Sequence, residues 1–271
     1  MEQKVKDRLI ELAAAYNNTR YFRNDPIIFP KHFAVLCSDF NCKYAEHDLS
    51  LVNDSCTCYT KTKQIRREDV EISAILAAHL AWGRRDMIVR DCNRMFDAMN
   101  WKPFEYVMNG NWKNNDASLH RTIKWSEFAL ICSNLQRFFR NGGKSLEELD
   151  QAATRTEIYG QKTDPNAANK KINMMRRWMV RDDGIVDLGL WKNTSRKDLI
   201  IPLDVHVHRT ALELGLTKRN SANLKTAMEI TEALREVFPE DPCLGDFALF
   251  AWSVTQRENK ENNKKIKYLI G

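Results

Sequence analysis

Apolar residues recur every three or four positions along most of the chain, and no stretch alternates long enough to suggest a strand. This spacing places apolar side chains on one face of a helix, whereas a half-buried strand alternates them. The first such stripe runs from Val5 to Tyr16, and similar stripes return from Glu68 to Val254. The sequence holds no internal repeat and no glycine-rich phosphate loop. The pattern predicts an all-α fold.

Length and charge narrow the class of protein further. A chain of 271 residues can bury a sizeable core as one large or two small domains. No run approaches the roughly 18 apolar residues of a membrane helix, and the charged N-terminus opens no signal segment. We therefore expect a cytoplasmic protein and a monomer. The net charge of +6, with a basic tail at 258–271, fits a polyanionic partner.

The segment 37–63 is polar and differs from everything around it. It holds four of the seven cysteines, Cys37, Cys42, Cys56 and Cys58. Their spacing lacks the two-residue knuckles of familiar zinc ribbons, so we expect a surface insertion and keep zinc as an alternative. An odd number of cysteines without a secretory signal favours reduced thiols over a disulfide framework.

A second constraint comes from the segment 200–216. Pro202 suits a first helical turn and Gly215 suits the left-handed position that ends a helix, which predicts a helix with Asp204 near its start. There the unpaired backbone N–H groups and the positive end of the helix dipole favour a carboxylate. Asp204 would either stabilise a neighbouring cation or only cap its helix.

The preceding helix begins with two lysines. Its apolar stripe contains Met175 and Trp178, with Lys171 at the N-terminal end of the stripe and Lys170 nearer its polar edge. A lysine beside apolar surface loses hydration, and its amine becomes a better nucleophile. The alternative is a lysine whose stem covers apolar surface while its ammonium reaches water.

These features together resemble the helix-hairpin-helix DNA glycosylase superfamily. The resemblance lies in a helix that starts with lysine, then a loop, then a helix opening Pro202–Arg209 with Leu-Gly-Leu after it. It implies a two-lobed helical bundle over residues 1–271, with Asp204 as the family's aspartate. The lysine matches Lys170, followed by Asn173, and we keep Lys171 beside it. The interval from lysine to aspartate is similar to that of the archaeal 8-oxoguanine glycosylases, and the whole-chain pattern most resembles an uncharacterised bacterial family at the superfamily's edge.

The resemblance also implies an activity. A damaged base, possibly an oxidised purine, would leave duplex DNA through a lysine Schiff base assisted by the aspartate, without a cofactor or a metal. Trp82 or Trp178 would stack on the extruded base, although both suit a protein core equally well. The residues that we expect to touch DNA are Trp82, Arg84, Arg85, Trp178, His206 and Arg209.

Two other functions stay open. The family's glycine hairpin, which holds a DNA phosphate, is replaced here by Thr163–Ala167, which leaves room for a DNA-binding module without catalysis. Asp204, His206 and His208 would suit a metal-dependent hydrolase if they lay on a strand, where alternate residues face the same way. On a helix, residues two apart point about 200° away from each other, and the pattern here is helical.

Overall fold

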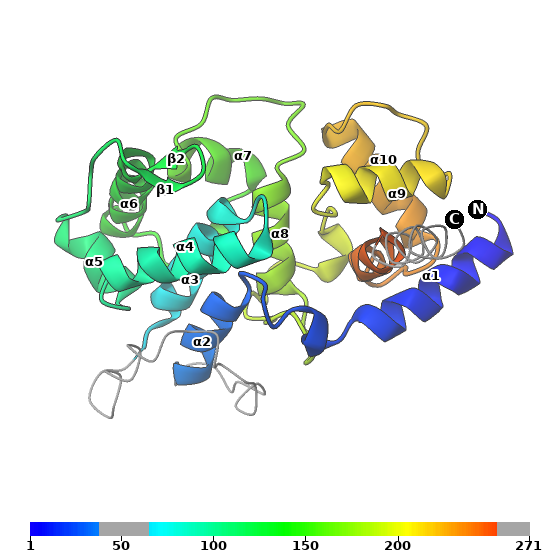
Figure 1. Ribbon diagram of the computed structural model, residues 1–271, viewed down its shortest axis with the longest axis horizontal. Helices are drawn as coiled ribbons and strands as arrows, with labels where there is room; N and C mark the ends of the chain where they lie inside the picture. The colour runs from blue at the N-terminus through cyan, green and yellow to red at the C-terminus, as the bar shows by residue number, and fades with distance from the viewer. Residues whose placement is uncertain (38–64, 254–271) are drawn as a thin grey trace, which may run out of the picture. The chain divides into compact units, whose positions relative to one another are not determined.

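The computed structural model describes residues 1–37 and 65–253, and these are almost entirely helical (Figure 1). The predicted all-α fold is confirmed. The predicted insertion, apart from Cys37, and the basic tail at 258–271 lie outside the described residues. None of the described helices is long and apolar enough to cross a membrane.

The chain divides into two compact units, and each is built from separate stretches of sequence. The first unit comprises Met1–Asn18, Asn166–Asn173 and the chain from Ser195 on. The second unit comprises Thr19–Pro165 and Met174–Thr194. The helix α8 (Lys170–Val180) begins in the first unit and continues into the second.

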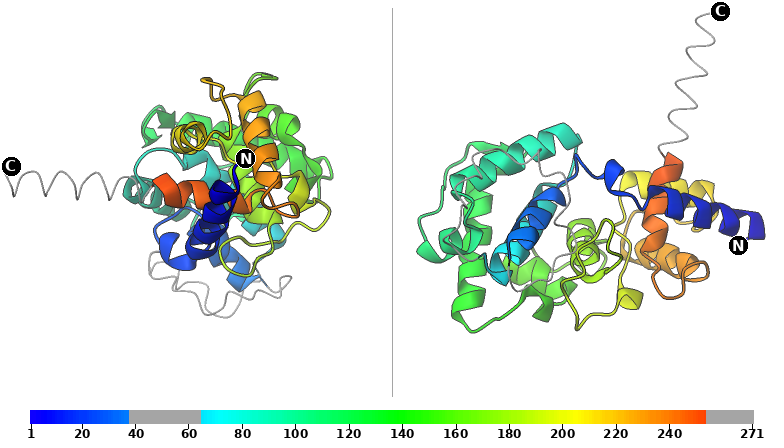
Figure 2. Two further views of the ribbon diagram at one scale, coloured as in Figure 1. Left: turned by 90° about the vertical axis from the view of Figure 1, so that its right-hand side faces the viewer. Right: turned by 90° about the horizontal axis from the view of Figure 1, so that it is seen from below.

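The helices of the first unit bury one face each. They are α1 (Gln3–Tyr16), the short η5 (Arg196–Asp198), α9 (Val205–Glu213), α10 (Leu224–Arg235) and the helical residues 244–253. In both Figure 1 and Figure 2, α1 runs beside the helical residues 244–253. There the rings of Tyr16 and Phe250 meet edge to face with centroids 6.4 Å apart.

One predicted helix start in this unit was wrong. Ser221 suits a helix cap, yet α10 begins at Leu224 and is capped by Asn223, whose side chain accepts from the backbone N–H of Thr226. Ser221 contributes its carbonyl oxygen instead, which accepts a hydrogen bond from the Thr226 hydroxyl at 2.6 Å. Asparagine and serine are equally good caps, so composition alone does not choose between them.

The second unit contains the larger core. Its helices are η1 (Thr19–Tyr21), α2 (Ile28–Leu36), α3 (Arg67–Leu80), α4 (Arg85–Ala98), α5 (Pro103–Asn109), α6 (Trp125–Arg140), η3 (Leu146–Glu148), α7 (Gln151–Ala153) and the π-helix η4 (Thr154–Ile158). From Asp69 to Leu80, α3 is buried on every side, as its apolar sequence predicts. The rings of Phe29, Phe33, Phe96 and Trp101 pack together beside it.

A short β-hairpin interrupts the helices of this unit. Strands β1 (Ser118–His120) and β2 (Ile123–Lys124) pair antiparallel, and Arg121 in the turn between them takes a positive φ of 54°. We expected no strand of convincing length, and strands this short leave no alternation to read in the sequence.

Candidate functional site

Asp204 lies where the sequence placed it, at the start of α9. Its Oδ1 accepts hydrogen bonds from the backbone N–H groups of His206 at 2.8 Å and Val207 at 2.9 Å, so it is the N-cap. Because Asp204 supplies this cap, the helix begins at Val205, and the prediction that Pro202 lies in the first turn was wrong. Gly215 takes a positive φ of 70° just after the helix, as predicted.

Lys170 and Lys171 are the first two residues of α8, and both side chains are half-buried. The stripe behind them is confirmed, because Ile172, Met175 and Trp178 are all at most 2% exposed. Both lysines belong to the same compact unit as Asp204. The structure therefore places the three predicted catalytic residues in one unit, each at or next to the N-terminus of a helix.

The loop that replaces the glycine hairpin is fixed within the first unit. The carbonyl oxygen of Asn166 accepts from the backbone N–H of Leu224, the first residue of α10, at 2.8 Å. The side-chain amide of Asn173 donates to the carbonyl oxygen of Ala168 at 2.9 Å. Asn169, at a positive φ of 46°, turns the chain into α8. The start of α8 is thus held by local hydrogen bonds.

The geometry does not favour the metal-hydrolase alternative. His206 and His208 lie on a helix, with His206 exposed and His208 buried. The Nε2 of His208 lies 2.7 Å from the carbonyl oxygen of Arg219, a hydrogen-bonding distance. Within residues 1–37 and 65–253, no group of three or more His, Cys, Asp or Glu side chains is arranged to hold a metal ion.

The cysteine predictions are only partly open to inspection. Cys37 is buried at the edge of the described chain, whereas Cys42, Cys56 and Cys58 lie outside the described residues, so the zinc alternative stays a hypothesis. Cys92 is a buried thiol, and burial raises its pKa well above the ordinary value.

Three of the predicted DNA-binding residues lie in the second unit, between α3 and α4. Trp82 is half-buried, and the guanidinium of Arg121 lies over its ring, 4.0 Å from the centroid. Arg84 is exposed and forms an ion pair with Asp86 at 2.6 Å. Arg85 donates to the carbonyl oxygen of Tyr21 at 2.8 Å.

The remaining candidates divide between surface and core. Arg209 is exposed on α9, with its Nε 3.9 Å from a carboxylate oxygen of Glu213 one turn away. Trp178 has no exposed surface, and its indole nitrogen has no hydrogen-bond partner among the described residues. Trp178 is therefore a core residue, the alternative that its apolar stripe allowed, and not a surface on which a base can stack.

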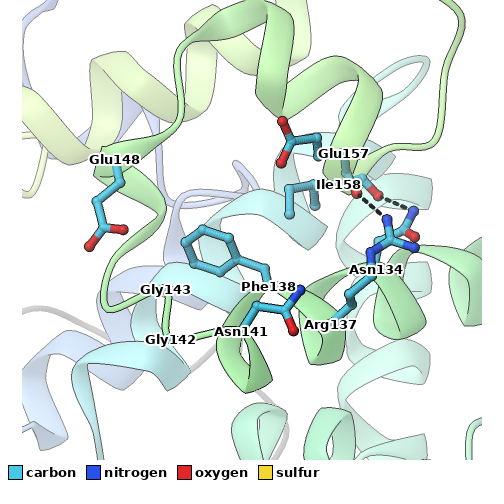
Figure 3. Close-up of a pocket in the computed structure, with 9 residues that line it drawn as sticks. All are labelled: Asn134, Arg137, Phe138, Asn141, Gly142, Gly143, Glu148, Glu157 and Ile158. Atoms are coloured by element: carbon cyan, nitrogen blue, oxygen red, sulfur yellow. Dashed lines mark hydrogen bonds between the residues drawn. The ribbon is translucent and has the colours of Figure 1, made fainter.

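A polar pocket of about 330 Å³ in the second unit has no counterpart in the sequence predictions. Figure 3 shows the Phe138 ring between Glu148 and Ile158, with Arg137 nearby on the same helix as Phe138. The nine lining residues are Asn134, Arg137, Phe138, Asn141, Gly142, Gly143, Glu148, Glu157 and Ile158. Sequence analysis missed it because the pocket joins the end of α6 to the π-helix η4, and a π-helix leaves no distinct periodicity.

Comparison with known protein families gives one match. The family described as "Protein of unknown function (DUF2400)" matches residues 58–161 and 149–255, which together span most of the chain. The chain belongs to this family. The DUF2400 match includes both lysines at the start of α8, Asp204 and the hairpin of the second unit. No curated protein and no solved structure matches the chain. The DUF2400 match does not extend to the glycosylase superfamily, whose resemblance rests on the residues described above.

Proposed function

We propose that this protein is a DNA glycosylase with AP lyase activity, which removes a damaged base from duplex DNA through a lysine Schiff base. The observation that supports this most is the fixed carboxylate of Asp204, in the same compact unit as two half-buried lysines. The family's resemblance to bifunctional glycosylases supplies the reaction, and the site supplies residues suited to each role.

The lysine amine is the nucleophile. In its neutral form it attacks C1′ of the damaged nucleotide, a carbon–nitrogen bond forms, and the base leaves with the electron pair of the glycosidic bond and gains a proton. Opening of the sugar ring then gives a protonated imine. Loss of a proton from C2′ expels the 3′ phosphate and breaks the strand. Lys170 and Lys171 both remain candidates, because both begin α8 and both are half-buried.

Asp204 provides the opposite charge. Departure of the base leaves positive charge on the sugar, and a carboxylate already held in place stabilises that charge without reorganising. Two backbone N–H groups orient Oδ1. In the described part of the chain no hydrogen bond uses Oδ2, so this oxygen can face the sugar or accept a proton.

Borohydride trapping tests the proposal, because borohydride reduces the imine to a stable amine and leaves the protein covalently attached to DNA. Duplex DNA with 8-oxoguanine or an abasic site would be incubated with wild type, Lys170→Gln, Lys171→Gln and Asp204→Asn. Lys225→Gln is the matched control, because Lys225 is an exposed lysine at the second position of α10, as Lys171 is of α8.

We expect one lysine variant to lose the adduct, the control to keep it, and Asp204→Asn to form it slowly. Asparagine caps a helix as well as aspartate does, so a slow Asp204→Asn reaction would reflect the lost charge and not a lost cap. No adduct and no base release across oxidised, alkylated and deaminated lesions would reject the glycosylase. A DNA-binding module without catalysis would then be the better description.

A further inference from the structure

We infer that the basic surface around the β1–β2 hairpin binds the sugar–phosphate backbone of duplex DNA. This hairpin surface consists of Arg84, Arg90, Arg94, Lys113, Arg121 and Lys124, all in the second unit. The choice of DNA as the partner rests on the proposed function, but the surface itself is defined by geometry and charge alone.

Tryptophan rings support the cations of this surface. Arg121 lies 4.0 Å from the centroid of Trp82, and Lys113 lies 4.2 Å from the centroid of Trp125. Such cation–π contacts hold a side chain in place without neutralising its charge. Gly83 makes room for the first pair, because a Cβ there would lie 2.4 Å from a guanidinium nitrogen of Arg121.

Buried hydrogen bonds lock the hairpin to the helices beneath it. His120, which is fully buried, places Nδ1 2.7 Å from a carboxylate oxygen of Asp91 on α4 and Nε2 2.9 Å from the carbonyl oxygen of Trp82. Arg94 of α4 donates to the carbonyl oxygens of Ser118 and Leu119 in β1. The cations therefore sit on a fixed scaffold and need little ordering when a ligand binds.

The surface carries more positive than negative charge. Asp91 serves two arginines, since its Oδ1 lies 2.9 Å from Arg90 and 3.9 Å from Arg94. Burial raises the pKa of Asp91, but hydrogen bonds from Arg90 and His120 outweigh this and leave the pKa below its usual value. Among the described residues, neither Lys113 nor Arg121 forms an ion pair with a carboxylate.

These properties fit a nucleic acid backbone better than an acidic protein surface. Duplex DNA offers a negative charge about every 1.7 Å along its axis, and arginine's planar fork matches phosphate oxygens in pairs. The exposed cations come from α4, the hairpin and the loops beside them, so they can meet several successive phosphates. Contacts to phosphates position a protein on DNA without reading its sequence.

Fluorescence anisotropy with an undamaged duplex tests this inference. The double variant Lys113→Gln with Arg121→Gln removes the two cations that lack carboxylate partners. The matched control is Lys144→Gln with Lys162→Gln, which removes two exposed charges from the same unit away from the hairpin. We expect the first variant to lose roughly five-fold in affinity per cation and about one unit of salt slope per phosphate contact. Equal loss in the control, or unchanged binding in the hairpin variant, would overturn the inference.

This experiment separates the hairpin surface from the glycosylase chemistry. Undamaged DNA requires no lysine attack, so salt-dependent binding that falls only in the hairpin variant supports the surface even if borohydride traps nothing. Trapping that persists while wild type and hairpin variant bind duplex equally would reject the surface and leave the glycosylase standing. Thermal denaturation of each variant checks that a loss of binding does not reflect unfolding.

Discussion

Trp191 donates its indole N–H to Oε1 of Glu71 at 2.9 Å, across 120 positions of sequence. Glu71 has no exposed surface and also accepts from the hydroxyl of Ser145 at 2.6 Å and the backbone N–H of Leu146 at 2.8 Å. Arg67, one turn earlier on α3, completes the set with an ion pair at 3.0 Å. A single buried carboxylate thus joins α3 to two distant loops.

Glu71→Gln should therefore destabilise the protein. Every partner of Glu71 is a donor, so the amide NH₂ of a glutamine must face at least one N–H or O–H without an acceptor between them. We expect the free energy of unfolding to fall by about 2–3 kcal/mol, measured by urea denaturation. The exposed Glu105→Gln in the same unit should stay within about 0.5 kcal/mol of wild type. An equal effect of both would show that the buried network contributes little.

Substitutions of Asp204 separate capping from chemistry. Asp204→Ala removes the acceptor of two backbone N–H groups, whereas Asp204→Asn keeps it. Alanine should be about 1 kcal/mol less stable than asparagine at this position in thermal or urea denaturation. Both variants should trap abasic DNA slowly. If Asp204→Asn traps at the wild-type rate, Asp204 is a helix cap and nothing more.

The pH dependence of stability should carry the signature of His32. Burial lowers the pKa of His32 from 6.5 to about 4. As the pH falls below 6.5, the unfolded chain takes up a proton that the folded protein refuses, so stability is lost between pH 6.5 and 4. The loss should approach about 3 kcal/mol and should disappear in His32→Leu. His206→Gln, an exposed histidine, is the control and should keep the wild-type slope.

Two glycines with the same backbone conformation should respond differently to alanine. Gly189 has a φ of 62° and Gly215 a φ of 70°, a region that costs alanine roughly 1–2 kcal/mol. A Cβ at Gly189 would also lie 2.6 Å from the Cα of Asp182, whereas nothing lies within 4 Å at Gly215. Gly189→Ala should therefore lower the melting temperature more than Gly215→Ala. Similar losses would mean that the loop at Asp182 moves aside easily.

The sequence predicts the helices well because their signals are local. The stripe of α1, the buried run of α3 and the turn at Gly215 each depend on residues within a few positions of one another. Asp204 belongs to the same group, since a cap and its helix are adjacent.

Features that join distant residues were not predictable. Arg181 is 1% exposed and forms a buried ion pair with Asp187, while Arg177 lies 3.4 Å from the other oxygen of the same carboxylate. In the sequence these arginines look like a charged helix face. Whether a charge is buried depends on where its partner folds back, which spacing along a helix does not reveal. The polar pocket and the support of Arg121 by Trp82 were missed for the same reason.

The division of the chain has a consequence for the order of folding during synthesis. α1 leaves the ribosome first, yet it belongs to a unit whose other helices come from the chain after Ser195. Its apolar residues Leu9, Leu12 and Ala13 must therefore wait uncovered while the second unit, complete by Thr194, collapses. The nascent chain carries an amphipathic helix without its partners for most of translation, which is the period when a chaperone would have most to protect.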